Sequence, residues 1–318
     1  MNYNEENAIL ISIPSFGLAL GVFSLGNLLK QYSPLVLIIC GIIGLILISH
    51  SISKFIKYPE RLKIKLKNPI AIGMLGTFPM GLMMFSTYIE KFIPKISLGL
   101  WLFAIIIQLI LTIYFTFWIL PKLKLKDIYS SILISYVGVS MISITSPYYG
   151  LENTIGHFFI IMGIISMIIL YIILMYRYIK IPIPDPIKPI IAILAAPIIV
   201  LVGYLTVVQN INFWIVVPIY LFTTCWYVYI IYKIIRYYLD FNWLPNHAAY
   251  TFTLAINATA GKMFYNYLLS ININIMPLYY FAIFQLIAAI SIIIIELYKF
   301  GEFVFTNKIN GFIKIKKN

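Results

Sequence analysis

The stretch that begins at Leu244 holds the residues of this chain whose types and spacing are most specific. It reads LPNHAAYTFTLAINATAGKMFYNYLL and ends at Leu269. It is long enough to cross a bilayer, because a helical span needs about 20 residues at about 1.5 Å each. Phe252 lies near its middle, among the polar residues Thr251, Thr253, Asn257, Thr259 and Lys262. Since polar groups are costly in hydrocarbon, we expect this segment to face protein or a water-filled path.

Two of these residues suggest a specific chemistry. A phenyl ring at Phe252 could close a narrow path by excluding water, although a packing ring is the simpler interpretation in a chain with 22 Phe. Lys262 follows about 15 Å along the helix axis and within about 80° of the Phe252 direction. It could attract anions to an outer vestibule or extend to the lipid headgroups. Asn257 is expected to bond between helices.

The remaining titratable residues form no catalytic or metal-binding pattern. The acids Glu90, Glu152, Asp240 and Glu296 all fall near the ends of apolar runs. Glu296 is expected to face headgroups or to pair with Lys299. A membrane enzyme such as a lipid transferase would need clustered acids or a nucleophile with a base, so we expect no enzyme, cofactor or metal site.

Composition indicates an all-α, polytopic membrane protein. Of the 318 residues 62% are hydrophobic and only 10% charged, whereas soluble domains carry about 25% charged residues. Hydropathy predicts ten spans in a single transmembrane domain, 1–318, with a short basic tail at 301–318. The spans run from about 8–29, 34–56, 70–92, 97–120, 128–149, 153–177, 189–209, 212–236 and 244–270 to 276–299.

The distribution of charge predicts an orientation. Nineteen of the 23 Lys and Arg residues follow even-numbered spans, and only three follow odd-numbered ones. The positive-inside rule therefore places both termini in the cytoplasm. This bias also accounts for the net charge of +13 without any nucleic-acid partner, with some contact to anionic lipid expected.

Odd-numbered spans differ from even-numbered ones in their helix-disturbing residues. Proline removes a backbone hydrogen bond and glycine allows close approach, and both recur at depth in the odd spans. The residues expected to line a path are Pro14, Gly17, Gly21, Pro79, Gly138, Pro197, Thr259 and Lys262. We therefore expect odd spans to form an inner ring and even spans to face lipid, the alternative being ordinary close packing.

Three motifs resemble one transporter family in the same order. IPSFGLALGVFSLGNLL resembles the first helix of the tellurite-resistance and C4-dicarboxylate transporter family, which includes the plant slow anion channels. KPIIAILAAPIIVLVGYL resembles its seventh helix, with the Ala-Pro element at Ala195, Ala196 and Pro197, and AAYTFTLAINATAGK resembles its ninth. The resemblance covers nearly the whole chain.

The resemblance implies a fold and a function. The family fold is five helical hairpins in a quasi-fivefold ring around a central pore, usually as a homotrimer in the plasma membrane. Phe252 matches the occluding phenylalanine by position, although Thr253 stands where many members have proline. The expected function is an anion channel or uniporter for small inorganic anions or C4-dicarboxylates such as malate, chloride, nitrate or sulfite. The alternative is a proton-coupled dicarboxylate or sulfite carrier of the same fold.

Overall fold

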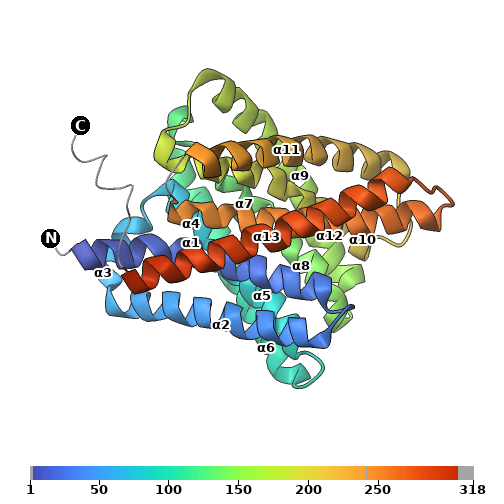
Figure 1. Cartoon of the computed structure of the whole chain (residues 1–318), viewed down its shortest axis with the longest axis horizontal. Coiled ribbons are helices and arrows are strands. Elements are labelled where there is room, and N and C mark those ends of the chain that lie inside the picture. The colour runs from blue at the N-terminus through green and yellow to red at the C-terminus, as the bar shows by residue number, and fades with distance from the viewer. Residues whose placement is uncertain (1–2, 241–242, 307–318) are drawn as a thin grey trace.

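The computed structural model describes residues 3–240 and 243–306, and within them every regular element is helical. Eight helical segments of this part of the chain are long and apolar enough to cross a membrane. They are Ser12–Leu29, Pro34–Lys57, Pro69–Ile89, Pro94–Lys122, Glu152–Lys180, Ile187–Val207, Phe213–Arg236 and Met276–Val304. The protein is therefore a multi-helix membrane protein. Figure 1 shows the long helices side by side, with α1 beginning and α13 ending at the same end of the bundle.

The first half of the chain contains both continuous and divided helices. It contains α1 (Tyr3–Leu29), α2 (Pro34–Lys57), the short α3 (Pro59–Lys65), α4 (Pro69–Leu75), α5 (Thr77–Ile89) and α6 (Pro94–Tyr114). Helix α6 continues as a π-turn, η1 (Phe115–Ile119), and two 3₁₀ turns follow, η2 (Leu120–Lys122) and η3 (Leu125–Asp127). Helices α7 (Ile132–Tyr136) and α8 (Ser140–Thr145) and the 3₁₀ turn η4 (Ser146–Tyr149) end this half.

The second half has the same character. A π-turn, η5 (Glu152–Gly156), leads into α9 (His157–Lys180). A long 3₁₀ segment, η6 (Asp185–Ile198), continues as α10 (Ile199–Val207). Helix α11 (Phe213–Asp240), the 3₁₀ turn η7 (Pro245–Ala248), α12 (Ala249–Ser270) and α13 (Met276–Thr306) complete the described chain.

Proline and glycine explain where the divided helices break. Pro79 is the third residue of α5, and its ring excludes the carbonyl of Leu75, the last residue of α4. Pro189 and Pro197 lie within η6, where each proline removes a backbone donor. Gly138 lies in the turn between α7 and α8, and a Cβ there would meet the carbonyl oxygen of Ile134 at 2.1 Å.

The divided helices, together with the continuous helices α1 and α12, form the buried part of the molecule. Helix α1 contacts α4 and α5, which contact α7 and α8. These contact η6 and α10, which contact α12, and α12 contacts α1 again. In the most apolar 18 residues of Ser12–Leu29, Pro69–Ile89 and Ile187–Val207, between 72% and 89% of residues are buried.

The even-numbered spans cover the outside of this set. In the most apolar 18 residues of the spans that contain α2, α6, α9, α11 and α13, only 28% to 39% of residues are buried. Their outer surfaces carry large apolar side chains such as Ile42, Ile106, Ile172 and Ile287. Exposing such surface to water costs about 25 cal/mol per Å², so a hydrocarbon environment is the one in which this arrangement is stable.

Two of the ten expected spans are not among the eight membrane-length apolar helices. The expected span 128–149 is divided into α7, α8 and η4, so that no single helix crosses its length. The expected span 244–270 contains α12, whose Thr, Asn and Lys residues lower its hydropathy. Helix α13 continues to Thr306, so the first part of the expected tail is helical, and residues 307–318 lie outside the described residues.

Candidate functional site

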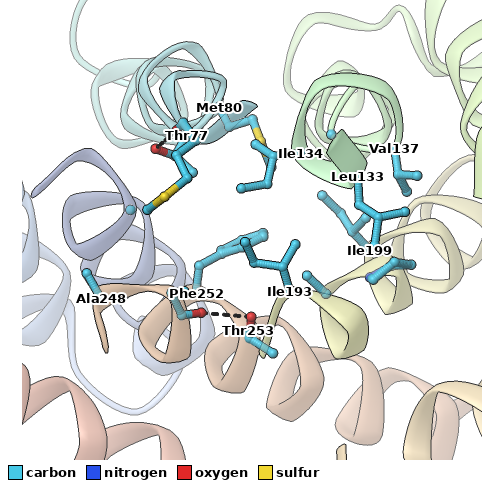
Figure 2. Close-up of a pocket in the computed structure, with 16 residues that line it drawn as sticks. Thr77, Met80, Leu133, Ile134, Val137, Ile193, Ile199, Ala248, Phe252 and Thr253 are labelled. Carbon is cyan, nitrogen blue, oxygen red and sulfur yellow. Dashed lines mark hydrogen bonds between the residues drawn. The ribbon is translucent and has the colours of Figure 1, made fainter. Parts of the chain in front are cut away.

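A small apolar cavity lies among the inner elements at the level of Phe252; we call it the Phe252 cavity. Its volume is about 40 Å³, which is room for a few water molecules. Five inner elements or pairs of elements contribute to its wall (Figure 2). The lining residues are Gly17, Met74, Thr77, Met80, Leu133, Ile134, Val137, Gly138, Ile193, Ala196, Pro197, Ile199, Ala248, Ala249, Phe252 and Thr253.

The two hydroxyls of this wall are already engaged. Thr77 Oγ1 donates to the carbonyl of Met74 at 2.7 Å, and Thr253 Oγ1 donates to the carbonyl of Ala249 at 2.9 Å. Their hydrogen atoms are thus used within their own segments. The cavity is therefore small and apolar, and its walls offer no free hydroxyl hydrogen to a bound ion.

The Phe252 side chain points into this cavity opposite Thr77, Met80 and Ile134 (Figure 2). The Phe252 side chain is 7% exposed, so it is buried but keeps a small accessible surface.

The backbone at Phe252 is fixed by a close contact between α1 and α12. Thr251 Oγ1 donates to the carbonyl of Ala248 at 2.7 Å and contacts the carbonyl oxygen of Gly17 at 3.3 Å. A Cβ at Gly21 would lie 2.9 Å from the Phe252 nitrogen, closer than real Cβ atoms come. Gly21 thus permits the approach of α1 that holds Phe252 in place.

A second, larger cavity lies further along the same inner elements; we call it the polar vestibule. Its volume is about 410 Å³. It is lined by Ser24, Asn27, Leu28, Lys30, Gln31, Met84, Thr87, Ile144, Thr145, Pro147, Tyr148, Val202, Thr206, Ile256, Thr259, Lys262, Met263 and Asn266. On α1 it begins about two helical turns beyond the Phe252 cavity, from Gly17 to Ser24, and on α5 and α12 it begins about one turn beyond it.

One face of α12 connects the two cavities. Ala249 and Phe252 line the Phe252 cavity, and Ile256, Thr259 and Met263 line the polar vestibule. Spacings of three and four residues put these side chains on one side of a helix. Helix α12 therefore presents a continuous stripe to both cavities.

The polar side chains of the vestibule form a network at its rim. The Asn27 amide donates to Thr87 Oγ1 at 3.0 Å, and Lys30 Nζ donates to Asn27 Oδ1 at 3.3 Å. Lys30 Nζ also donates to the hydroxyl of Tyr148, whose ring centroid lies 4.9 Å away. Lys30 therefore bridges the end of α1 to η4 across this cavity.

Lys262 lies at the boundary of the polar vestibule. Its ammonium nitrogen is 5.7 Å from the centroid of the Tyr32 ring, within the range of a cation–π contact. Lys262 also lines a neighbouring groove with Tyr32, Tyr265 and Tyr279. Its charge thus faces both the vestibule and the outer surface beside α13.

Some of the residues expected from sequence to line a path line one of the two cavities, and the others line neither. Gly17, Gly138, Pro197 and Phe252 line the Phe252 cavity, and Thr259 and Lys262 line the polar vestibule. Neither cavity is lined by the remaining residues, Pro14, Gly21 and Pro79. Pro14 is buried inside α1, and Pro79 lies where α4 gives way to α5.

Two further expectations concern polar groups outside the cavities. Asn257 does bond between segments, because its amide donates to the carbonyl of Ala195 in η6 at 3.0 Å. The expectation for Glu296 was wrong: its side chain is fully buried and accepts a hydrogen bond from the Trp243 indole at 2.9 Å. Lys299 instead pairs with Glu302 at 3.0 Å.

Sequence reasoning missed several residues of both cavities. Asn27 and Lys30 look like the end of a span and its loop, and Thr77 and Met80 look like ordinary span residues. The only signal for Asn27 is a polar amide two to three turns beyond Gly17 and Gly21. The rotation of one helix against another, which brings these residues together, is not readable from hydropathy.

Cavities enclosed by the inner elements of a helical membrane protein are a feature of channels and transporters. Residues 11–300 match the family model described as voltage-dependent anion channel, and the chain belongs to this family. The match confirms the tellurite-resistance and C4-dicarboxylate transporter family that the three motifs resemble. Members of this family are channels and transporters rather than enzymes. No curated protein matches the chain.

Proposed function

We propose that this protein conducts small anions, either inorganic anions or C4-dicarboxylates, along a path through its inner elements that the Phe252 ring closes. The observation that carries the proposal is the succession of the two cavities. Helices α1, α5, α10 and α12 line both, and Phe252 lies on the wall of the narrower one. A dry ring of apolar side chains is a known way for a channel to close.

The chemistry of the two cavities supports anions over cations. Among the described residues that line them, the charged side chains are Lys30 and Lys262, both in the polar vestibule. Ammonium groups at the mouth of a path raise the local concentration of anions. The Phe252 cavity carries no charged side chain that would hold an ion and slow its exit.

The proposal includes the complete arrangement of spans. We take α7 with α8, and η7 with α12, as the two crossings that complete ten, so that five hairpins surround the path. The cycle of contacts from α1 through α5, α8 and α10 to α12 supports this arrangement. The protein would act in the cell membrane as a homotrimer, with both termini in the cytoplasm.

Replacement of Phe252 by alanine tests the closing role. The Phe252→Ala variant should raise anion conductance in reconstituted bilayers by about tenfold or more, since each 1.4 kcal/mol removed from a barrier gives about tenfold in rate. The flux should persist when the pH gradient is abolished, which separates passive conduction from proton-coupled transport.

Phe264→Ala is a matched control for this experiment. Phe264 lies on the same helix, is 4% exposed, and stacks on Tyr220 with ring centroids 3.9 Å apart. It lines neither cavity. Both variants lose a buried phenyl ring, so a general loosening of the fold would raise conductance in both. An increase confined to Phe252→Ala supports the proposal, and unchanged conductance in that variant refutes it.

A further inference from the structure

A groove on the outer side of the molecule is separate from both cavities; we call it the lysine groove. It lies between the end of α9, the segment that precedes η6, η6 itself and α11, and its volume is about 730 Å³. It is lined by Tyr178, Pro182, Ile183, Lys188, Ile191, Leu194, Cys225, Trp226, Tyr229 and Lys233. None of these residues lines the Phe252 cavity or the polar vestibule.

The two walls of the groove carry their lysines at the same end. The η6–α10 segment and α11 are consecutive and joined by residues 208–212, so they run in opposite directions. Lys188 lies near the start of η6, and Lys233 lies near the end of α11. Lys188 and Lys233 are therefore near one another along the bundle axis, while Leu194 and Cys225 mark the other end.

Away from the lysines the groove is apolar for a considerable length. From Lys233 to Cys225 is about 12 Å along an α-helix, and from Lys188 to Leu194 is about 12 Å along a 3₁₀ helix. Ile191, Leu194 and Trp226 line this part. The groove thus has a cationic end and an apolar end.

The cationic end has the features of a membrane interface. Lys233 Nζ lies 5.3 Å from the ring centroid of Tyr229 and 5.8 Å from that of Tyr232. Tyrosine rings and lysines are typical at headgroup depth, where an aromatic body meets hydrocarbon and a polar tip meets water. Among the described side chains that line the groove none is acidic. The charged side chains among these lining residues, Lys188 and Lys233, are both cationic.

We propose that the lysine groove binds an anionic phospholipid, with the phosphate at Lys188 and Lys233 and an acyl chain along Ile191, Leu194 and Trp226. Charge complementarity selects the headgroup, and the length of apolar wall beside it selects a lipid over a free anion. The site does not depend on the anion path.

The 3₁₀ geometry of η6 places this site one helix face away from the Phe252 cavity. With three residues per turn, Lys188, Ile191 and Leu194 share one face, and Ile193, Ala196 and Ile199, at the junction with α10, share another. Lys188, Ile191 and Leu194 line the lysine groove, and Ile193, Ala196 and Ile199 line the Phe252 cavity together with Pro197, which lies next to the end of η6. A lipid that orders the first face therefore also restrains the part of the cavity wall that η6 forms beside Phe252.

Lipid binding to the wild-type protein is tested by how far a bound lipid protects the Cys225 thiol from a maleimide. Cys225 lines the groove and is exposed, whereas Cys40, the other cysteine, is buried. In detergent, phosphatidylglycerol should slow the reaction of Cys225 with a maleimide by about tenfold. Phosphatidylcholine with the same acyl chains, or inorganic phosphate alone, should slow it less than twofold.

The charge requirement is tested by native mass spectrometry of two double variants. Lys188→Gln with Lys233→Gln should weaken phosphatidylglycerol binding by about tenfold to thirtyfold, since each lysine near a membrane surface contributes about a factor of five. Lys122→Gln with Lys124→Gln removes the same charge from exposed positions outside the groove and should leave binding unchanged.

Three results would overturn the proposal. Equal protection of Cys225 by both lipids would indicate a nonspecific apolar groove, and protection by phosphate alone would indicate a simple anion site. A slow reaction of Cys225 with the maleimide in the absence of added lipid, together with cross-linking of Cys225 between subunits, would indicate that a second copy of the chain covers the groove. Because the thiol measurement uses the wild-type protein, it decides the matter even if the double variant fails to fold.

Discussion

At the scale of the residue, Phe252 is distinguished by its position rather than by its type. Many of the other phenylalanines are equally buried, and Phe16 and Phe23 are packed against further aromatic rings. Phe252 instead lies on the wall of a cavity, with its backbone held by Thr251 and by the close approach of Gly21. A ring on a fixed backbone can close a path reproducibly.

Lys262 carries the prediction about ion preference. Lys262→Gln should reduce the preference for anions over cations, because one of the two charges on the polar vestibule is lost. The reversal potential in a salt gradient measures this preference. The shift should be clear at about 0.1 M salt and nearly absent at about 1 M, since the screening length falls from about 10 Å to about 3 Å.

Lys91→Gln provides the control for this measurement. Lys91 is exposed and lines neither cavity. An equal shift in both variants would indicate only a change in overall surface charge. No shift in Lys262→Gln would mean that this ammonium group serves its contact with Tyr32 and the neighbouring groove.

At the scale of the element, the division of the inner helices follows from their proline and glycine residues. Pro79, Pro197 and Gly138 each lie where a continuous α-helix gives way to a turn or a 3₁₀ segment. These breaks let backbones approach closely, as at Gly73, where a Cβ would meet the carbonyl oxygen of Ser131 at 2.7 Å. The unbroken outer helices keep the divided ones away from lipid.

Gly21→Ala tests the contact between α1 and α12. The new Cβ would lie 2.6 Å from Thr251 Oγ1 and 2.9 Å from the Phe252 nitrogen, so the two helices must separate. We expect a loss of about 1–3 kcal/mol in stability, which is typical for overpacking. Thermal unfolding of the detergent-solubilised protein measures the loss as a lower melting temperature.

Gly99→Ala is the matched substitution in an open environment. Gly99 lies in α6, and apart from its chain neighbours and the nearby backbone of its own helix no atom lies within 4 Å of its Cβ position. This variant should be as stable as the wild type or more stable by about 0.5–1 kcal/mol, because alanine favours the helix. If Gly21→Ala melted at the same temperature as Gly99→Ala, the contact between α1 and α12 would be looser than described.

The sequence predicts the character of the elements better than their rotation. Pro79 and Pro197 mark helices that break, and the aliphatic runs of the even spans mark helices with exposed outer faces; both expectations agree with the structure. It does not predict that Asn27 meets Thr87 or that Lys30 reaches Tyr148. Those contacts depend on the angle of each helix about its axis, which tertiary packing sets.

The same limit applies to the buried polar groups. Glu296 lies near the end of an apolar run, where a carboxylate ordinarily meets headgroups, yet the Trp243 indole provides a partner inside the protein. Trp243 precedes η7 and is far from Glu296 in the sequence. The local sequence pattern therefore predicts correctly that Glu296 lies near a helix end, and it fails to predict that the side chain is buried in the protein.

At the scale of the whole molecule, the outer helices provide the contact with the membrane, and the inner elements provide the cavities. The outer helices satisfy the membrane with apolar side chains such as Ile42 and Ile106, while the inner elements carry the breaks, hydroxyls and amides. The polar vestibule and the Phe252 cavity both lie within the inner set, and the lysine groove lies on its outer side. Helical segment η6 belongs to both regions and connects the lipid surface to the proposed path.

The central claim, that the Phe252 ring closes an anion path, is tested most directly by varying the size of the side chain at this one position. Anion conductance of reconstituted protein should rise in the order Phe252, Phe252→Leu, Phe252→Ala and Phe252→Gly, because a smaller side chain leaves a wider and wetter constriction. Conductance that does not depend on side-chain size at this position, or that rises equally in Phe264→Ala, would contradict the account.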